Sequence, residues 1–368
     1  MPEIPLIDAS TLAEWLKTGK EVTVLDIRPN DEREEWQIPG SIYLDAYKRL
    51  NEGDFSVMDE VSIPKNVPVV AVCAAGRTSQ IAARELRKRE FDAYSLKQGM
   101  KGWSLAWNQA AIFFDNYQVI QLRRTGKGCL SYIIASDSKA IVIDASLPIE
   151  VYESILRDKN WQLEAVMETH VHADHLSRSK QLADHLGVPL KLPVLNKVSF
   201  DHYKIEDGQT IKLQSVSIKV IATPGHTVES ICFLVNNEIL FTGDTIFTNA
   251  VGRPDLKADE DESRNRASLL FDSLQMLMKL KDTIIVLPAH TSSPIAFDEK
   301  PVKATLSDIK NTVSILHLSK EKFVETILAR LPATPPNYLT IVERNLSGNI
   351  SDINPIDLEA GANRCAVP

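Results

Sequence analysis

The residues with the clearest chemical potential are histidines and aspartates that follow apolar runs. Three of the eight histidines and one aspartate fall within the stretch THVHADH. Imidazole nitrogen and carboxylate oxygen are the donors that zinc and iron bind in proteins. So many polar groups at a strand end would be costly to bury without a cation. We therefore predict a metal site built from this cluster and three later residues. The candidate ligands are His170, His172, Asp174, His175, His226, Asp244 and His290.

A second reactive position is Cys73, which follows the apolar run VPVVAV and opens the loop CAAGRTS. The loop leads into a predicted helix, whose first backbone N–H groups stabilise a thiolate. Arg77 adds a positive charge. We predict that Cys73 is a nucleophile assisted by Arg77, against the alternative of a small buried thiol. The other cysteines lack such a context and are expected in strands or in the tail: Cys129, Cys232 and Cys365.

Alternating strand and helix patterns are expected to position Cys73. Valine-rich runs at 22–25 and 67–72 are typical of buried parallel strands. Helical periodicity appears at 12–17 and 79–89, so the first part of the chain reads as βαβ units. The stretch 108–117 breaks the periodicity and is taken as a junction. We expect one domain over 1–110 and a second over 111–368.

Strands are expected to position the metal ligands, because each ligand follows an apolar run. The later part of the chain predicts strands at 119–123, 130–136, 140–145 and 163–168, with a helix at 149–158. Two strand pairs follow, the second turning at Asn236-Asn237. A helix at 263–280 precedes a strand at 283–287. The last 20 residues show little periodicity and are expected to fray. Three histidines are expected to be ordinary: His185, His202 and His317.

Composition narrows the class of protein. The 368 residues are 44% hydrophobic and 24% charged, as in globular proteins. A net charge of -8 argues against a nucleic-acid binder. Four scattered cysteines fit a reducing compartment. The N-terminal stretch lacks a basic segment with a long apolar run, and no 18-residue apolar window occurs. We therefore expect a cytoplasmic protein with no membrane segment.

The motifs HVHADH, TPGH, TGD and a late AH resemble the metallo-β-lactamase superfamily over about 115–295. The resemblance implies an αββα sandwich. It also leaves two chemistries open. In glyoxalase II-like members two Zn2+ ions hydrolyse thioesters. In the persulfide dioxygenases one Fe2+ ion is held by two histidines and one carboxylate.

The dioxygenase resemblance maps the iron ligands onto His170, His226 and Asp244. The other candidates, His172, Asp174, His175 and His290, would then surround the iron or form a vacant second metal position. The stretch GRPDL is similar to a dioxygenase segment whose arginine approaches the substrate carboxylate. Arg253 takes that place as a substrate-binding residue. The other interpretation of Arg253 is a structural ion pair with Asp255.

The first part of the chain resembles a single-domain rhodanese over about residues 5–108. The matching pieces are VLDIRPNDE, IPGSIYL, CAAGRTS and QGMKGW. The resemblance implies that Cys73 carries sulfane sulfur as a persulfide. Thr78 stands where many rhodaneses have arginine.

Together these resemblances predict an enzyme that oxidises a small thiol persulfide with O2 and exchanges sulfur with thiosulfate or sulfite. The thiol carrier stays open, because no aromatic residue follows His290. No nucleic-acid or membrane partner is expected, and a homo-oligomer is expected from the relatives. Two alternatives remain. One is a dizinc thioester hydrolase, and the other is a rhodanese unit that only docks a persulfidated protein.

Overall fold

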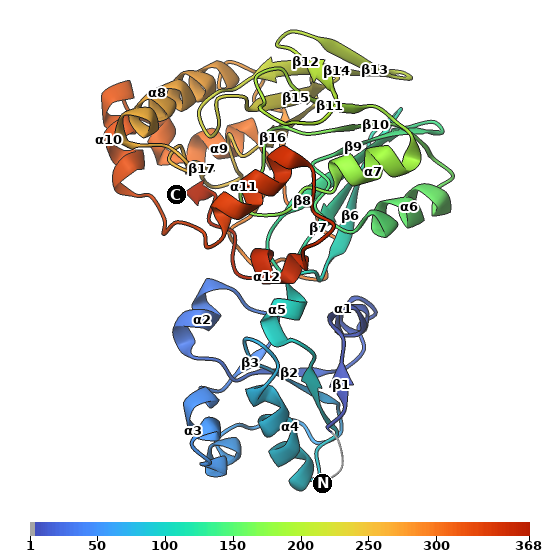
Figure 1. Cartoon of the computed structure of the whole chain (residues 1–368), viewed down its shortest axis with the longest axis vertical. Coiled ribbons are helices and arrows are strands. Elements are labelled where there is room, and N and C mark those ends of the chain that lie inside the picture. Colours follow the sequence, from blue (N-terminus) through green and yellow to red (C-terminus); the bar gives the residue numbers. More distant parts are fainter. Residues whose placement is uncertain (1–3) are drawn as a thin grey trace.

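The computed structural model describes residues 4–368 and contains a smaller unit below a larger one in Figure 1. β-Branched side chains buried on both faces build the first sheet, which is parallel with the order β1-β5-β4-β2-β3. Its strands are β1 (Leu6–Ile7), β2 (Thr23–Asp26), β3 (Ile42–Tyr43), β4 (Val69–Val72) and β5 (Ala93–Leu96). Its helices are α1 (Ala9–Lys17), α2 (Asn30–Glu35), α3 (Tyr47–Asn51), η1 (Phe55–Asp59), α4 (Thr78–Lys88) and α5 (Gly99–Trp103).

The larger unit has two main sheets. The first has the order β12-β11-β10-β9-β8-β7-β6 and the second β13-β14-β15-β16-β18-β19. The first sheet comprises β6 (Asn108–Phe113), β7 (Gln118–Arg123), β8 (Leu130–Ser136), β9 (Lys139–Ile143), β10 (Gln162–Met167), β11 (Leu190–Pro193) and β12 (Tyr203–Ile205). The second comprises β13 (Thr210–Leu213), β14 (Val216–Ala222), β15 (Ile231–Val235), β16 (Ile239–Gly243), β18 (Ile285–Pro288) and β19 (Ala304–Thr305).

Helices cover the outer faces of both sheets. Those over the first sheet are α6 (Ile149–Asp158) and α7 (Ser179–Leu186). Those over the second are α8 (Glu260–Leu277), α9 (Leu306–Thr312), η2 (Ser314–His317) and α10 (Lys320–Ala329). The inner faces share one apolar core, in which the Tyr132 and Phe241 rings meet edge to face with centroids 4.8 Å apart. These layers confirm the expected αββα sandwich behind a parallel-sheet α/β domain.

Most expected elements are present. The helix expected at 149–158 is α6, and the strand expected at 130–136 is β8. The turn at Asn236-Asn237 is confirmed, since both residues adopt positive φ angles (49° and 56°) between β15 and β16. No helix within residues 4–368 is long and apolar enough to cross a membrane.

The expectation of an irregular junction at 108–117 is wrong. Residues Asn108–Phe113 form β6, which pairs antiparallel with β7. Alternate residues of β6 are buried, but the buried positions include Asn108 and Ala110, so hydrophobicity alone conceals the period-2 pattern. The division into 1–110 and 111–368 remains a proposal.

The expectation of a fraying tail is also wrong. After α11 (Tyr338–Ser347) the chain forms α12 (Pro355–Glu359), and β20 (Ala366–Val367) pairs with β17 (Val251–Gly252). The Glu359 side chain is fully buried, with Arg124 and the Leu176 N–H as partners at 2.5 and 2.7 Å. Contacts this distant in the sequence leave no local periodicity, which explains the error.

The two units meet along a closely packed seam. The Trp36 indole donates a hydrogen bond to the Thr125 carbonyl at 3.0 Å, and Arg364 pairs with Glu35 at 2.8 Å. At Gly126 a Cβ atom would lie 1.8 Å from the Trp103 carbonyl oxygen, so only glycine fits. A cavity of about 180 Å³ lies at this seam, lined by Ala74 of the Cys73 loop on one side and by tail residues 360–362 on the other.

Candidate metal centre

Three side chains that leave the ends of strands converge on one point. His170 follows β10, His226 follows β14 and Asp244 follows β16 directly. The Nε2 atoms of His170 and His226 lie 3.7 and 3.5 Å from Asp244 Oδ2. All three side chains are buried, and within residues 4–368 neither His170 Nε2 nor Asp244 Oδ2 has a hydrogen-bond partner. Buried polar atoms are otherwise paired, so this geometry fits a cation.

The orientation of His170 depends on Thr169, its neighbour in the chain, and on Asp144, which follows β9. Asp144 accepts hydrogen bonds from the Thr169 backbone N–H at 2.8 Å and from its hydroxyl at 2.9 Å. The Thr169 hydroxyl oxygen then accepts from His170 Nδ1 at 2.9 Å. This series of hydrogen bonds keeps the proton of His170 on Nδ1, so the lone pair of Nε2 is free to bind a metal. At Gly243 (φ 52°) a Cβ atom would lie 2.6 Å from that hydroxyl and disturb the arrangement.

The other two donors are held in the same way. His226 Nδ1 donates to the backbone carbonyl of Arg253 at 2.7 Å. His290 Nδ1 donates to Asp244 Oδ1 at 2.5 Å, which leaves Oδ2 facing the two imidazoles. Every donor of the group therefore has a partner on the atom that faces away from the centre, as metal ligands commonly have.

Burial sets the charge of these groups. Burial lowers the pKa of His170 and of His226, so both imidazoles are neutral near pH 7, the form that binds metals. Burial alone would raise the pKa of Asp244, but His290 and then His170 outweigh it and hold the pKa below its ordinary value. The group thus offers two neutral nitrogens and one carboxylate.

A second group lies beside the first, and its members contact one another. His175 Nδ1 donates to Asp174 Oδ1 at 3.0 Å. His290 Nε2 lies 2.9 Å from Asp174 Oδ2, so the His290 ring stands between two carboxylates. The Cys129 thiol lies 3.3 Å from Asp174 Oδ2 and 3.8 Å from His175 Nδ1. This group offers ligand atoms for a second ion: both Asp174 oxygens already accept hydrogen bonds, while Nε2 of His175 and of His290 form none within residues 4–368.

Ion pairing decides the charges in this second group. Burial alone would lower the pKa of His290, but Asp174 and Asp244 raise it well above its usual range. Burial also opposes the charge on His175, and Asp174 raises its pKa to about 10. Burial and Asp174 would raise the pKa of the Cys129 thiol, but His175 and His290 lower it to about 7.

His172 belongs to neither hydrogen-bonded set. Its Nε2 atom lies 3.4 Å from Asp144 Oδ1, and neither ring nitrogen has a hydrogen bond within the described part of the chain. The rings of His170 and His172 lie 4.3 Å apart. His172 is therefore a further donor within reach of the centre.

Several contributors to the centre have no obvious sequence signal. Cys129 was expected in a strand and Cys365 in the tail. Cys129 does form a β-bridge directly before β8, and Cys365 does lie in the tail. What the sequence does not show is that Cys129 lies beside Asp174 and His175, and Cys365 near Asp244 and His290. Asn363 also reaches Asp174. The proximity of Asp144 could have been suspected, because it follows a strand as the ligands do.

The structure places Arg253 differently from the predicted substrate contact. Its guanidinium forms two hydrogen bonds with Asp255, at 2.7 and 2.8 Å, and others with the carbonyls of Ala333 and Arg364. The residue is 1% exposed, so no donor is presented to a substrate. The structural ion pair is the interpretation that these contacts favour. Through its carbonyl, Arg253 orients His226 instead.

The Cys73 loop forms a cradle around its sulfur. The thiol accepts hydrogen bonds from the backbone N–H groups of Gly76 at 3.1 Å and Ser79 at 3.4 Å, and the Ser79 hydroxyl lies 3.3 Å away. Cys73 directly follows β4 and the loop enters α4, as the sequence predicts. Arg77 is exposed at the N-cap of α4, and its guanidinium forms no hydrogen bond or ion pair with residues 4–368.

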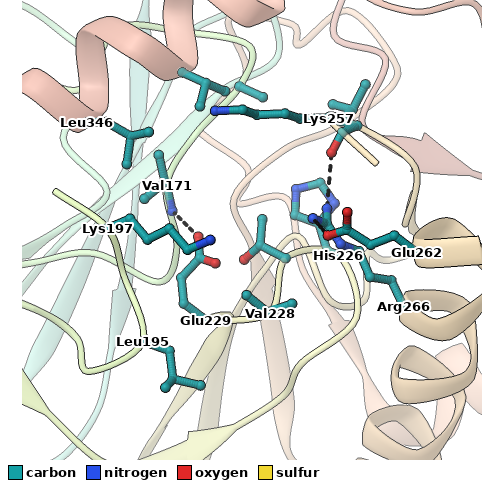
Figure 2. A pocket seen from close by; sticks show the side chains of 14 residues that line it. Val171, Leu195, Lys197, His226, Val228, Glu229, Lys257, Glu262, Arg266 and Leu346 are labelled. Carbon is teal, nitrogen blue, oxygen red and sulfur yellow. Dashed lines mark hydrogen bonds and ion pairs between the residues drawn. The ribbon is translucent and has the colours of Figure 1, made fainter. Parts of the chain in front are cut away.

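A cavity of about 230 Å³ reaches the metal centre at His226 (Figure 2). Val171 and Ala173, the residues between the ligands of the HVHADH motif, form part of its wall. Leu195, Leu256 and Leu346 add apolar surface. The cavity gives a small molecule a route to the candidate ligands.

Comparisons with known proteins agree with this architecture. A family model described as "Metallo-beta-lactamase superfamily" matches residues 124–290, and one described as "Rhodanese-like domain" matches residues 8–106. A Bacillus velezensis protein named "Probable polyketide biosynthesis zinc-dependent hydrolase BaeB" is 32% identical over 201 residues, which are 52% of this chain and 84% of that protein. A hydroxyacylglutathione hydrolase from Francisella tularensis is 34% identical over 164 residues, 43% of this chain and 61% of that protein.

Two solved structures share the fold. The crystal structure of a metallo-beta-lactamase from Staphylococcus aureus superposes with a TM-score of 0.58 and 24% identity, covering 64% of this chain and 74% of that one. The crystal structure of ETHE1 from Myxococcus xanthus gives a TM-score of 0.52 and 24% identity, covering 61% and 95%. At this identity the likeness concerns the fold alone.

Proposed function

The chain belongs to the metallo-beta-lactamase superfamily and carries a rhodanese-like domain, and we propose that it is a bifunctional enzyme of sulfur metabolism. In this proposal the metal centre oxidises the persulfide of a small thiol: RSSH, O2 and H2O give RSH, sulfite and two protons. The rhodanese-like domain transfers sulfane sulfur through Cys73, with thiosulfate or sulfite as its small-molecule partners.

The observation that carries the proposal is the difference between the two groups of donors. The first group directs three ligand atoms toward a common point, from His170, His226 and Asp244. Two of these atoms, His170 Nε2 and Asp244 Oδ2, form no hydrogen bond within residues 4–368. Two histidines and one carboxylate are the ligand set of non-haem ferrous enzymes, and they leave coordination positions open. In the second group Nε2 of His175 and of His290 also form no hydrogen bond within residues 4–368. The carboxylates differ, because both oxygens of Asp174 already accept hydrogen bonds, from His175 and Asn363, whereas Asp244 Oδ2 accepts none. This supports Fe2+ on the first three residues.

When bound, ferrous iron supplies the redox chemistry toward O2 that side chains lack. The residues of the chain hold and shield that site. Thr169 and the Arg253 carbonyl fix the two imidazoles in the tautomer with free Nε2 atoms. His290 keeps its proton on Nδ1 toward Asp244 Oδ1, so the other carboxylate oxygen faces the centre. The walls of the cavity orient the persulfide toward His226.

At Cys73 the proposed step is attack of the thiolate on the outer sulfur of thiosulfate. A bond forms between Cys73 Sγ and that sulfur, the sulfur–sulfur bond of thiosulfate breaks, and sulfite leaves with the electron pair. The N–H groups of Gly76 and Ser79 stabilise the charged sulfur. Arg77 lies at the same loop with its guanidinium free to attract the anion. Since sulfite is also the product of the metal centre, the two domains share one pool.

The test is metal analysis joined to oxygen uptake. The chain is purified without air, its metals are quantified, and O2 consumption is followed with glutathione and coenzyme A persulfides. About one iron per chain together with oxygen uptake supports the proposal. A chain that carries only zinc and never consumes O2 with any persulfide contradicts it.

The second candidate is a dizinc thioester hydrolase. The observation in its favour is that two relatives above 30% identity are named a zinc-dependent hydrolase and a hydroxyacylglutathione hydrolase. All seven ligand positions of the motif are also present here. Two zinc ions per chain and cleavage of a thioester would establish this alternative.

A further inference from the structure

The cavity that reaches His226 has charged groups at its mouth that the proposed metal chemistry does not use. Lys197 and Lys257 line it, and both are exposed. Within the described residues 4–368 neither ammonium group forms an ion pair or a hydrogen bond. Figure 2 shows the two lysines coming from different segments, with the end of Lys197 drawn beside the Glu229 carboxylate and Lys257 on the other side of the pocket. They are thus available to a ligand.

The remaining charges of the cavity are already engaged. Arg266 pairs with Glu262 and donates to the Leu256 carbonyl at 3.0 Å, which neutralises that carboxylate. Glu229 accepts a hydrogen bond from the Val171 backbone N–H at 3.2 Å. Three cations against two carboxylates leave a net charge of +1 around the cavity. The whole chain carries -8, so this opening has the opposite sign to the rest of the protein.

The backbone at Lys257 is unusual for a lysine. Its φ angle is 56°, in the left-handed region that residues other than glycine rarely adopt. The preceding carbonyl of Leu256 is held by Arg266, and the Leu256 side chain lines the same cavity. Such backbone conformations persist where the surroundings enforce them, often at ligand sites.

We propose that Lys197 and Lys257 bind anionic groups of the thiol carrier, so that the substrate is a persulfide of a thiol bearing carboxylates or phosphates. The inference rests on the proposed function and names the substrate class of the same site. The apolar walls take the carbon skeleton, the reactive sulfur points toward His226, and the charged end stays at the mouth near solvent. Uncharged small thiols lack the second point of attachment and are poor carriers.

Binding without turnover is the first test. The full-length protein is titrated with S-methylglutathione and S-methyl-coenzyme A, thioethers that cannot be oxidised as persulfides. The K197A/K257A double variant is compared with K212A/K219A, which removes two exposed lysines of β13 and β14. We expect about a ten-fold increase in Kd for the anionic thioether in the first variant, since exposed ion pairs are each modest, and none in the control. Kd should also rise with ionic strength in the unaltered protein only.

Turnover gives the second test. Oxygen uptake is measured with glutathione, coenzyme A and 2-mercaptoethanol persulfides. We expect the KM advantage of an anionic carrier over the uncharged one to disappear in K197A/K257A. Binding of one thioether and not the other identifies carboxylate or phosphate as the anion. Equal Kd values in K197A/K257A and K212A/K219A overturn the inference. If no persulfide supports oxygen uptake while the lysine-dependent binding persists, the proposed function fails and this binding site stands.

Discussion

Asn363 donates a hydrogen bond from Nδ2 to Asp174 Oδ2 at 3.1 Å, although 189 residues separate them in the chain. Asp174 is the residue that joins His175, His290 and Cys129, so the tail directly supports the second group of donors. The same tail residue accepts a hydrogen bond from the Cys365 backbone N–H at 2.8 Å. The segment after α12 is therefore part of the candidate metal centre.

Replacing Asn363 with alanine should loosen this group. A buried acceptor that loses its donor costs about 1–3 kcal/mol, so we expect a lower free energy of unfolding and faster loss of metal to a chelator. Thermal denaturation and timed metal release measure both. N349A alters an exposed asparagine of the same region and serves as the control. Indistinguishable behaviour of the two variants would show that the tail does not support the centre.

Replacing His226 with alanine should remove one of three proposed iron ligands. We expect loss of iron and of persulfide-dependent oxygen uptake, while sulfur transfer by Cys73 continues, because the two centres lie in different domains. Metal analysis, oxygen uptake and a thiosulfate sulfurtransfer assay check the three parts. H317A, at an exposed position outside both sites, should keep all three. Undiminished oxygen uptake in H226A would refute the ligand assignment.

Replacing Cys73 with serine should abolish sulfurtransfer and leave oxygen uptake intact, the reverse of the result expected for H226A. The hydroxyl cannot carry sulfane sulfur, so sulfurtransfer should fall to the background rate while oxygen uptake with added persulfide persists. C232S, whose sulfur lies in the core near the Thr223 hydroxyl at 3.4 Å, is the matched control. A C73S protein that still exchanges sulfur with thiosulfate would require a different nucleophile. If C73S loses sulfurtransfer but still binds a persulfidated protein, then docking and sulfur transfer are separate properties of this domain.

Glu359 makes the fold sensitive to acid. Burial alone would raise its pKa, but Arg124 and then Arg178 lower it below the ordinary value of 4.5. Because the folded pKa lies below the unfolded one, this stabilisation is complete above about pH 4.5 and is lost as the pH falls through the folded pKa. The midpoint of thermal unfolding should therefore drop on acidification.

E359Q tests this assignment. The amide leaves two buried guanidinium groups without their anion, which should cost about 3–5 kcal/mol at neutral pH. It should also flatten the part of the acid dependence that Glu359 supplies. Thermal unfolding from pH 3 to 7 compares both proteins, with E343Q on α11 as an exposed control. An E359Q profile parallel to that of the unaltered protein would assign the acid sensitivity to other groups.

The sequence predicts the candidate site better than it predicts what surrounds it. His170, His226 and Asp244 could be placed together because each follows an apolar strand, and strand ends of one sandwich meet at the same edge. Thr169, Cys129 and Asn363 could not, since their roles arise from tertiary contacts without periodicity or unusual composition. Arg253 illustrates a third case. Its motif was found, but only burial and the Asp255 pair reveal that its side chain is occupied.

The close backbone approach at Gly126 restricts how such a protein could be rebuilt. Because no side chain fits between that residue and the Trp103 carbonyl, and the Trp36 indole also spans the boundary, the two units are matched in shape. A rhodanese-type module from another protein could not simply be exchanged for this one. A working chimera would need its own aromatic anchor and an equally small residue at the point of contact.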